Sequence, residues 1–292
     1  SNTGYRVLPD GTILFCEYTR PSVATTNVWR IDSNSDIKNP SNWIVVKSFN
    51  LSGDLYSGLK HCHMIMYDHY AGITYLSTGD DDIGSQVWHS KDGGITWTQT
   101  RDASEKYCRM LNYVFLEDYI YWSSDTAVKN YHYIFRAPRK EDGVIDYDNV
   151  TDLQLIPYID THVATYGVSY LKDLNLLQLI ERVDGTGNAT EMPIRGYDLA
   201  TNSLVTLGVI KSVDGVGHNL GFRTEYTEWY PNDGIIKFGF GGKYTWNSAL
   251  NCNKGLGNVG SYTEKCCVNN LTMKPFKNDN KFGVKFDTII IN

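Results

Sequence analysis

The chain has 292 residues, 41% of them hydrophobic and 13% aromatic, which is enough apolar surface for a large buried core. Its formal net charge is −6, and its longest run of basic residues is the pair Arg139-Lys140, which argues against nucleic acid as the main partner. No apolar run reaches the roughly 18 residues that a membrane-spanning helix needs, so we expect no membrane insertion.

Short runs of alternating apolar and polar residues follow one another along the chain, and clusters of Gly, Asn and Asp separate them. Such runs, with a turn about every 8–12 residues, predict β-strands. Helical periodicity is almost absent, so we expect an all-β fold. In chain order the expected strands lie at 12–19, 27–32, 43–49, 63–68, 73–80, 86–90, 110–118, 119–125, 131–136, 167–173, 176–181, 194–199, 204–210, 235–241 and 284–291.

A unit of strand, turn and strand recurs along the chain with a period of about fifty residues. It is clearest at 61–80, 107–125, 164–181 and 221–242. This period, with four short strands per unit, is typical of a β-propeller blade. We therefore expect one β-propeller domain over 1–292 with five blades, or six as the alternative, at about 1–60, 61–106, 107–161, 162–216 and 217–292. We expect the last strand to pair with the first blade and close the ring.

The stretch SKDGGITW, residues 90–97, lies between two expected strands of the second blade. It matches the pattern S-x-D-x-G-x-T-W and resembles the Asp-box, the repeat of sialidase-like β-propellers. In that family the turn lies on the face opposite the active site. The resemblance implies that the Asp carboxylate binds backbone amides of its own turn, that glycine supplies a positive φ, and that the Trp packs into the blade. We therefore interpret Ser90, Asp92, Gly94 and Trp97 as structural.

The resemblance extends over about the first 140 residues. The opening GYRVLPDGTILFCEYTR resembles a shortened sialidase opening, and 61–80 followed by the box is similar to bacterial and phage Asp-box proteins. This likeness implies a domain of a larger surface or phage tail protein, located extracellularly or on the cell or virion surface. Sialidase activity is not expected, because Val-Leu-Pro follows Arg6 where the family has Ile-Pro, and because the neighbours Glu225 and Tyr226 point to opposite faces of a strand.

A ring of polar side chains is expected around the propeller axis, because innermost strands start there and second strands return there. The strand starts contribute His61, His63, Arg109, Tyr166, His218 and Arg223, and the second-strand ends contribute Asp80, Asp125 and Glu181. Guanidinium groups bind carboxylates through paired hydrogen bonds, so the ring predicts a site for a polar or acidic carbohydrate. Two alternatives stay open: the acids cap turns, or the arginines form ion pairs between blades.

The primary hypothesis is a glycan-recognising domain, lectin-like or receptor-binding. The alternative is a glycan-cleaving enzyme, a glycoside hydrolase or polysaccharide lyase acting on an acidic sugar, with His63, Tyr166, Asp80 and Asp125 as candidate catalytic residues. A third hypothesis is a purely structural ring with protein partners on the blade edges. The six cysteines contain no CxxC pair and are interpreted as buried free thiols.

A metal site is considered at the start of the second blade. His61 and His63 project to the same side of an expected strand and could bind a metal together with Asp80 or Asp125. Two imidazoles without a fixed third ligand favour polar rim residues instead. We therefore expect no metal and no cofactor.

Overall fold

The computed structural model describes residues 4–18, 25–50, 61–80, 82–101, 104–125, 132–156, 163–183 and 191–211, together with seven two-residue strands beyond residue 221. The chain divides into two compact units, unit 1 over Ser1–Leu155 and unit 2 over Ile156–Asn292, where a single propeller domain was expected. The two units are described separately. Among the described residues, none of the helices has the length and apolar character needed to cross a membrane.

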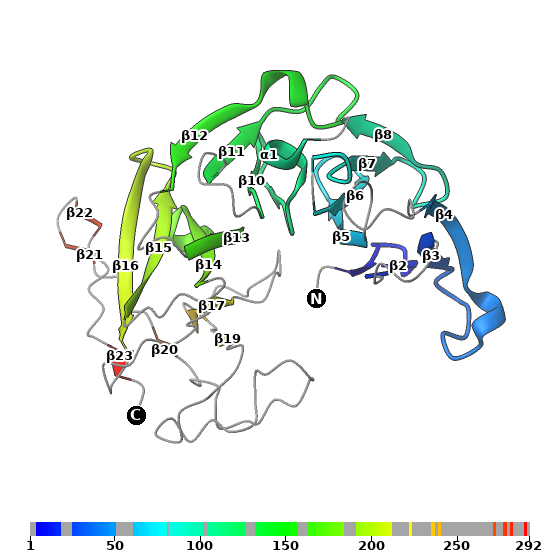
Figure 1. Ribbon diagram of the computed structural model, residues 1–292, viewed down its shortest axis with the longest axis horizontal. Coiled ribbons are helices and arrows are strands. Elements are labelled where there is room, and N and C mark those ends of the chain that lie inside the picture. Colours follow the sequence, from blue (N-terminus) through cyan, green and yellow to red (C-terminus); the bar gives the residue numbers. More distant parts are fainter. Residues whose placement is uncertain are drawn as a thin grey trace. The chain divides into compact units, whose positions relative to one another are not determined.

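Unit 1 contains three antiparallel sheets of four strands each, and Figure 1 shows them side by side in chain order. The first sheet consists of β1 (Tyr5–Val7), β2 (Ile13–Cys16), β3 (Thr25–Ile31) and β4 (Ile44–Asn50). The second consists of β5 (His61–Asp68), β6 (Ile73–Gly79), β7 (Val87–Ser90) and β8 (Thr98–Arg101). The third consists of β9 (Val114–Phe115), β10 (Ile120–Ser123), β11 (Tyr133–Ala137) and β12 (Thr151–Leu155). The short helix α1 (Glu105–Cys108) lies along the chain between the second and third sheets, whereas η1 (Pro40–Asn42) lies between β3 and β4 and η3 (Tyr147–Asn149) between β11 and β12.

Unit 2 contains one longer sheet. Its strands are β13 (Val163–Leu171), β14 (Leu176–Val183), β15 (Glu191–Asp198), β16 (Ser203–Lys211) and β23 (Ile289–Ile290), with η4 (Lys172–Leu174) between the first two. The remaining strands form pairs of two residues each: β17 (Phe222–Arg223) with β19 (Gly239–Phe240), β18 (Ile235–Ile236) with β20 (Leu271–Thr272), and β21 (Lys277–Asn278) with β22 (Lys281–Phe282).

We expected the last strand to pair with the first blade. Among the described residues, β23 instead runs parallel to β16, with Ile289 opposite Ile210.

Each of the four larger sheets takes its first four strands in chain order, with every neighbouring pair antiparallel. A four-stranded antiparallel meander of this kind is the blade of a β-propeller. The described part of the chain is therefore all-β, with at least four blade-like sheets, and they lie within the first four expected blade ranges.

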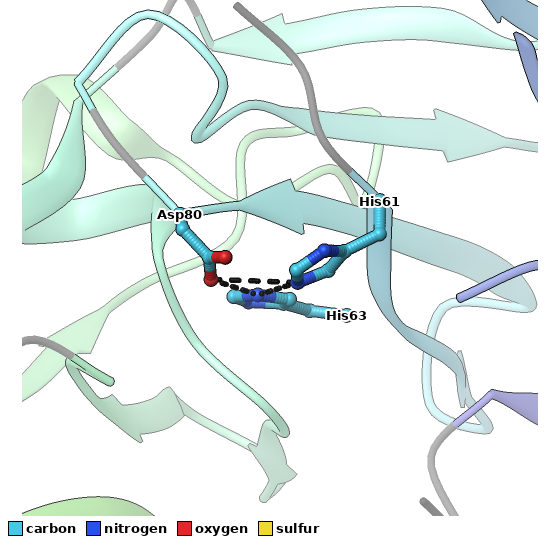
Figure 2. A group of neighbouring side chains, drawn as sticks. All are labelled: His61, His63 and Asp80. Atoms are coloured by element: carbon cyan, nitrogen blue, oxygen red, sulfur yellow. Dashed lines mark hydrogen bonds and ion pairs between the residues drawn. The ribbon is translucent and has the colours of Figure 1, made fainter. Parts of the chain in front are cut away.

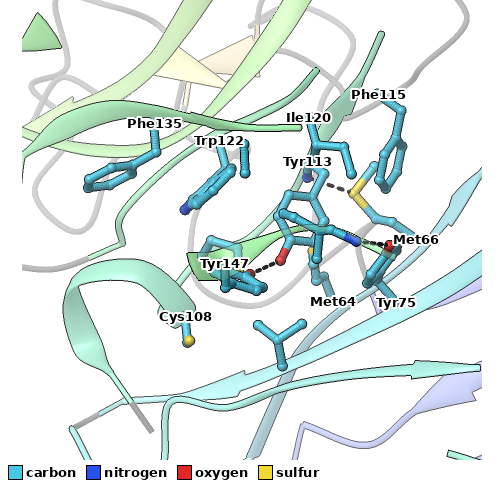
Figure 3. Close-up of a cluster of buried hydrophobic side chains, with 14 of the residues drawn as sticks. Met64, Met66, Tyr75, Cys108, Tyr113, Phe115, Ile120, Trp122, Phe135 and Tyr147 are labelled. Carbon is cyan, nitrogen blue, oxygen red and sulfur yellow. Dashed lines mark hydrogen bonds between the residues drawn. The ribbon is translucent and has the colours of Figure 1, made fainter. Parts of the chain in front are cut away.

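An aromatic core joins the second and third sheets (Figure 3). Tyr75 of β6 is fully buried, and its hydroxyl accepts a hydrogen bond from the backbone N–H of Ile145 at 2.9 Å. The hydroxyls of Tyr113 and Tyr147 bind each other, and the ring of Trp122 packs edge-on against both. Burial raises the pKa of all three tyrosines, so their hydroxyls stay neutral, and the bond from Ile145 to Tyr75 links the third sheet to the second.

A buried ion pair also connects these two sheets. The guanidinium of Arg139 donates from Nε to Asp68 Oδ2 at 2.7 Å and from Nη2 to Asp68 Oδ1 at 3.0 Å. Its Nη1 reaches the carbonyls of Leu116 and Glu117, both at 2.8 Å. The side chain of Asp68 is completely buried, so this ion pair, like the aromatic core, links the two sheets away from solvent.

Candidate functional site

Two histidines and an aspartate meet at one end of the second sheet. His61 begins β5 and pairs with Gly79, the last residue of β6, and Asp80 follows directly. The register between β5 and β6 shifts between Cys62 and Met64, which makes His63 the extra residue of a β-bulge. Bulges change the direction of a side chain, and this one brings His63 against both His61 and Asp80 (Figure 2).

The three polar atoms lie within hydrogen-bonding range of one another. His63 Nε2 is 3.1 Å from His61 Nε2 and 3.1 Å from Asp80 Oδ1. His61 Nε2 lies 3.4 Å from the same carboxylate oxygen. The side chains of His61 and His63 are only 6% and 2% exposed, whereas that of Asp80 is 30% exposed. The two histidine side chains are therefore enclosed by protein, and the carboxylate of Asp80 is accessible to solvent.

Gly79 makes room for the ring of His63. A Cβ atom at this position would lie 2.2 Å from His63 Cε1 and 2.6 Å from its Nε2, far inside van der Waals contact. Only glycine lets the imidazole lie against the backbone of β6. Sequence reasoning missed this residue, although a glycine at the end of a strand run is a recognised sign of close approach.

The charge on Asp80 is set by its neighbours. Burial works to raise the pKa of this carboxyl, but hydrogen bonds and charge from His61 and His63 outweigh it and hold the pKa far below its usual range. Arg109, which follows α1, places Nη2 3.6 Å from Asp80 Oδ1. This distance allows an ion pair but is too long for a good hydrogen bond. Asp80 is therefore an ionised carboxylate beside a guanidinium.

An exposed aromatic ring lies over the cluster. The ring of Tyr18 stacks on that of His61, with centroids 3.8 Å apart and planes 30° apart. Tyr18 is 67% exposed. It is positioned by the preceding residue, since the carboxylate of Glu17 accepts from the indole N–H of Trp29 at 2.7 Å and from the backbone N–H of Asn27 at 2.8 Å. Sequence reasoning missed Tyr18. The sign that could have found it is its position, since it is an aromatic residue just after the end of β2, the second strand of its sheet.

The structure thus brings together four of the predicted ring residues, His61, His63, Asp80 and Arg109, all in unit 1. Asp125 joins them through its backbone, whose N–H donates to the carbonyl of Arg109 at 2.6 Å. The others belong to unit 2. Tyr166 and Glu181 lie on β13 and β14, and Arg223 lies on β17, but their side chains are outside the described part of the chain, as is the whole of His218.

The turn at residues 90–97 lies at the opposite end of the same sheet, because Ser90 pairs with Thr74 near the start of β6. Asp92 Oδ1 accepts hydrogen bonds from the N–H groups of Ile95 and Thr96 at 3.0 and 2.9 Å. Ser90 Oγ donates to Asp92 and accepts from the N–H of Gly94, both at 2.8 Å. The carboxylate therefore organises the turn and has no role in the histidine cluster.

The turn at residues 90–97 also joins the second sheet to the first. Gly94 has φ +85°, and a Cβ there would lie 2.6 Å from Leu14 of the first sheet, so glycine is required twice over. The carbonyl of Gly93 accepts from Arg30 Nε at 3.1 Å. The indole N–H of Trp97 donates to the carbonyl of Gly94 at 3.0 Å, and its ring packs against the core between the first two sheets.

Replacing Asp92 with alanine is expected to lower the free energy of unfolding by about 1–2 kcal/mol at neutral pH, because the amides of Ile95 and Thr96 lose a charged acceptor. Burial works to raise the pKa of Asp92, but hydrogen bonds from Thr96, Ser90 and Ile95 lower it to about 2 from 3.8. The stabilisation is therefore complete above pH 4 or so and is lost as pH falls through about 2. Urea denaturation of both proteins between pH 7 and pH 2.5 checks this; a difference independent of pH would contradict it.

Comparisons with known proteins identify no family for this chain. No protein-family model matches the sequence, and the comparison with curated proteins finds no match. Among solved structures, the chain is similar to the GH74 enzyme of Niastella koreensis at 16% identity and TM-score 0.45, covering 75% of this chain and 31% of that one. It is also similar to the periplasmic gluconolactonase of Pseudomonas aeruginosa (11% identity, TM-score 0.46, covering 80% and 61%) and to Sqt1 of Saccharomyces cerevisiae (12%, 0.39, covering 95% and 62%).

The chain spans less than two thirds of the length of each of these three structures. These three are different kinds of protein, and the similarity indicates no function for this chain.

Proposed function

We propose that this chain is a glycan-recognising domain, a five-bladed propeller of the sialidase-like Asp-box type, which binds a polar or acidic saccharide at His61, His63, Asp80, Arg109 and Tyr18. The observation that carries the proposal is an exposed tyrosine ring stacked on a buried histidine beside an ionised carboxylate and a guanidinium. Binding sites for small ligands combine an aromatic surface with a few positioned polar groups, and this cluster has both.

The polar groups suit the chemistry of a sugar. Saccharide hydroxyls both donate and accept hydrogen bonds, and here a carboxylate accepts, a guanidinium donates, and an imidazole does either. An acidic sugar would add a carboxylate within reach of Arg109, whose Nη2 lies 3.6 Å from Asp80 Oδ1. The exposed face of Tyr18 is an apolar surface next to these groups.

The family part of the proposal rests on the turn at 90–97. Its residues fit the Asp-box pattern, its carboxylate bonds to amides of the same turn, and it lies at the end of the sheet away from the histidine cluster. The Asp-box resemblance implies that arrangement. It supports, for the whole protein, a receptor-binding role in a bacterial or phage surface or tail protein, acting outside the cell.

A glycan array of acidic and neutral polysaccharides tests the binding function. The wild type is expected to bind one group of glycans, and Tyr18→Ala and Arg109→Ala are each expected to weaken that binding at least about tenfold. Tyr70→Ala is the matched control, since Tyr70 is also an exposed tyrosine of the second sheet but lies in the turn after β5, at the other end. Absence of any bound glycan, or equal binding by all variants, would overturn the proposal.

A second candidate function is cleavage of the glycan. The contact of His63 Nε2 with the ionised Asp80 at 3.1 Å favours it, because a carboxylate that orients an imidazole is the usual support of a general base. The test is mass spectrometry on every glycan that binds. Shortened chains that disappear with His63→Ala would establish a hydrolase or lyase, and intact chains would leave recognition alone.

A further inference from the structure

We propose that His61, His63 and Asp80 form a binding site for a divalent transition-metal cation, with Zn²⁺ as the best fit. Two ring nitrogens and a carboxylate oxygen lie close enough together to share one ion. The expectation of no metal rested on the lack of a fixed third ligand, and Asp80 Oδ1 supplies one. The site would exist whether or not the chain binds saccharide.

The distances between the donor atoms agree with tetrahedral coordination. The three atoms form a triangle with edges of 3.1, 3.1 and 3.4 Å. In a tetrahedral zinc site with bonds of about 2.0–2.1 Å, neighbouring ligand atoms are about 3.3–3.4 Å apart. Small rotations of the two rings close this difference.

The identity of the donor atoms selects the class of metal. Imidazole nitrogen suits zinc, copper, nickel and iron, whereas Ca²⁺ and Mg²⁺ prefer an all-oxygen environment. Two histidines and one carboxylate, with a fourth position left for water or ligand, is the composition of a family of catalytic zinc sites. The 30% exposure of Asp80 leaves solvent access on that side. A bound ion would therefore supply Lewis acidity at this position.

The ligand atoms face one another, as Figure 2 shows, and a metal explains this better than hydrogen bonds do. If both neutral imidazoles donated an Nε2–H to Asp80 Oδ1, the two N–H groups would face each other with their nitrogens 3.1 Å apart. An ion accepts lone pairs from all three atoms at once.

The site is held rigidly before any ion binds. The bulge aims His63, Gly79 gives its ring room, and both histidine side chains are almost fully buried. Pre-positioned ligands bind a metal tightly because little conformational freedom is lost on binding.

The test is a zinc titration of the full chain after removal of metals with EDTA and dialysis, in competition with a chromophoric chelator. We expect one Zn²⁺ per chain with a Kd of about micromolar or tighter, and at least about tenfold weaker binding by His63→Ala and Asp80→Ala. His89→Ala is the matched control, because His89 is a half-buried histidine of the same sheet whose Nδ1 contacts Thr100. Its affinity should equal that of the wild type.

A second readout needs no substitution and distinguishes this site from one made of cysteines. Co²⁺ added to the wild type should give visible absorption bands of a tetrahedral nitrogen and oxygen site, without a thiolate charge-transfer band. The proposal is overturned by the absence of zinc binding, by a thiolate band, or by unchanged affinity in folded His63→Ala and Asp80→Ala proteins. Zinc binding without glycan binding would leave this proposal standing while the proposed function fails.

Discussion

Replacing Asp68 with alanine is expected to lower the free energy of unfolding by about 3–5 kcal/mol, among the largest effects of any single substitution in unit 1. The carboxylate is completely buried and holds Arg139 through two hydrogen bonds. Without it, the guanidinium of Arg139 stays between the second and third sheets and keeps the carbonyls of Leu116 and Glu117 and the ring of Tyr70, but loses its carboxylate. The Tyr70 N–H also loses its acceptor. An uncompensated buried charge is the cause of the large cost.

Asp142→Ala is the matched control for this prediction. Asp142 also forms an ion pair between the second and third sheets, since Lys91 Nζ is 2.8 Å from its Oδ2, but both side chains are exposed. Exposed pairs contribute about 0–1 kcal/mol, so we expect a small change. Urea denaturation followed by tryptophan fluorescence measures both. If the two variants had equal midpoints, the Asp68 pair would not stabilise the interface between the sheets.

The sequence predicts strand positions well but not the register between paired strands. Expected strands at 63–68, 73–80 and 86–90 lie close to β5, β6 and β7, because alternation of apolar and polar residues is a local property. The bulge at His63 is not local, since it depends on which residues of β6 face it. The helix α1 was not expected either, although Ser104 accepts a hydrogen bond from the N–H of Tyr107 as a helix cap does.

In the candidate site, too, the local features were predictable from the sequence and the contacts between strands were not. Alternation along a strand predicts that His61 and His63 share a side, and the repeat predicts that Asp80 and Arg109 lie at the same end of their blades. The choice of Asp80 over Asp125 as the third partner depends on the register of β5 and β6 and could not be predicted. Nor could the ion pair of Asp68 and Arg139, because residues 71 positions apart meet only through the packing of two sheets.

Replacing Gly79 with alanine is expected to disrupt the histidine cluster without changing any of its three polar groups. The new Cβ would lie 2.2 Å from His63 Cε1, and the ring is 2% exposed, so it cannot turn aside without displacing its neighbours. We expect a loss of stability of about 1–3 kcal/mol from this overpacking. We also expect zinc affinity to fall at least about tenfold, because His63 Nε2 leaves the position that it shares with His61 and Asp80.

Gly196→Ala separates the general cost of a clash from its effect on the site. A Cβ at Gly196, on β15 of unit 2, would lie 2.6 Å from Leu176 Cδ2, so this variant should lose stability but keep its zinc affinity. A double-mutant cycle then tests the geometry without any metal. In a His63→Ala background the ring is gone, and Gly79→Ala should cost little stability. If Gly79→Ala lowered the free energy of unfolding equally in the wild type and in His63→Ala, the ring of His63 would not lie against Gly79. The proposed geometry of the metal site would then be wrong.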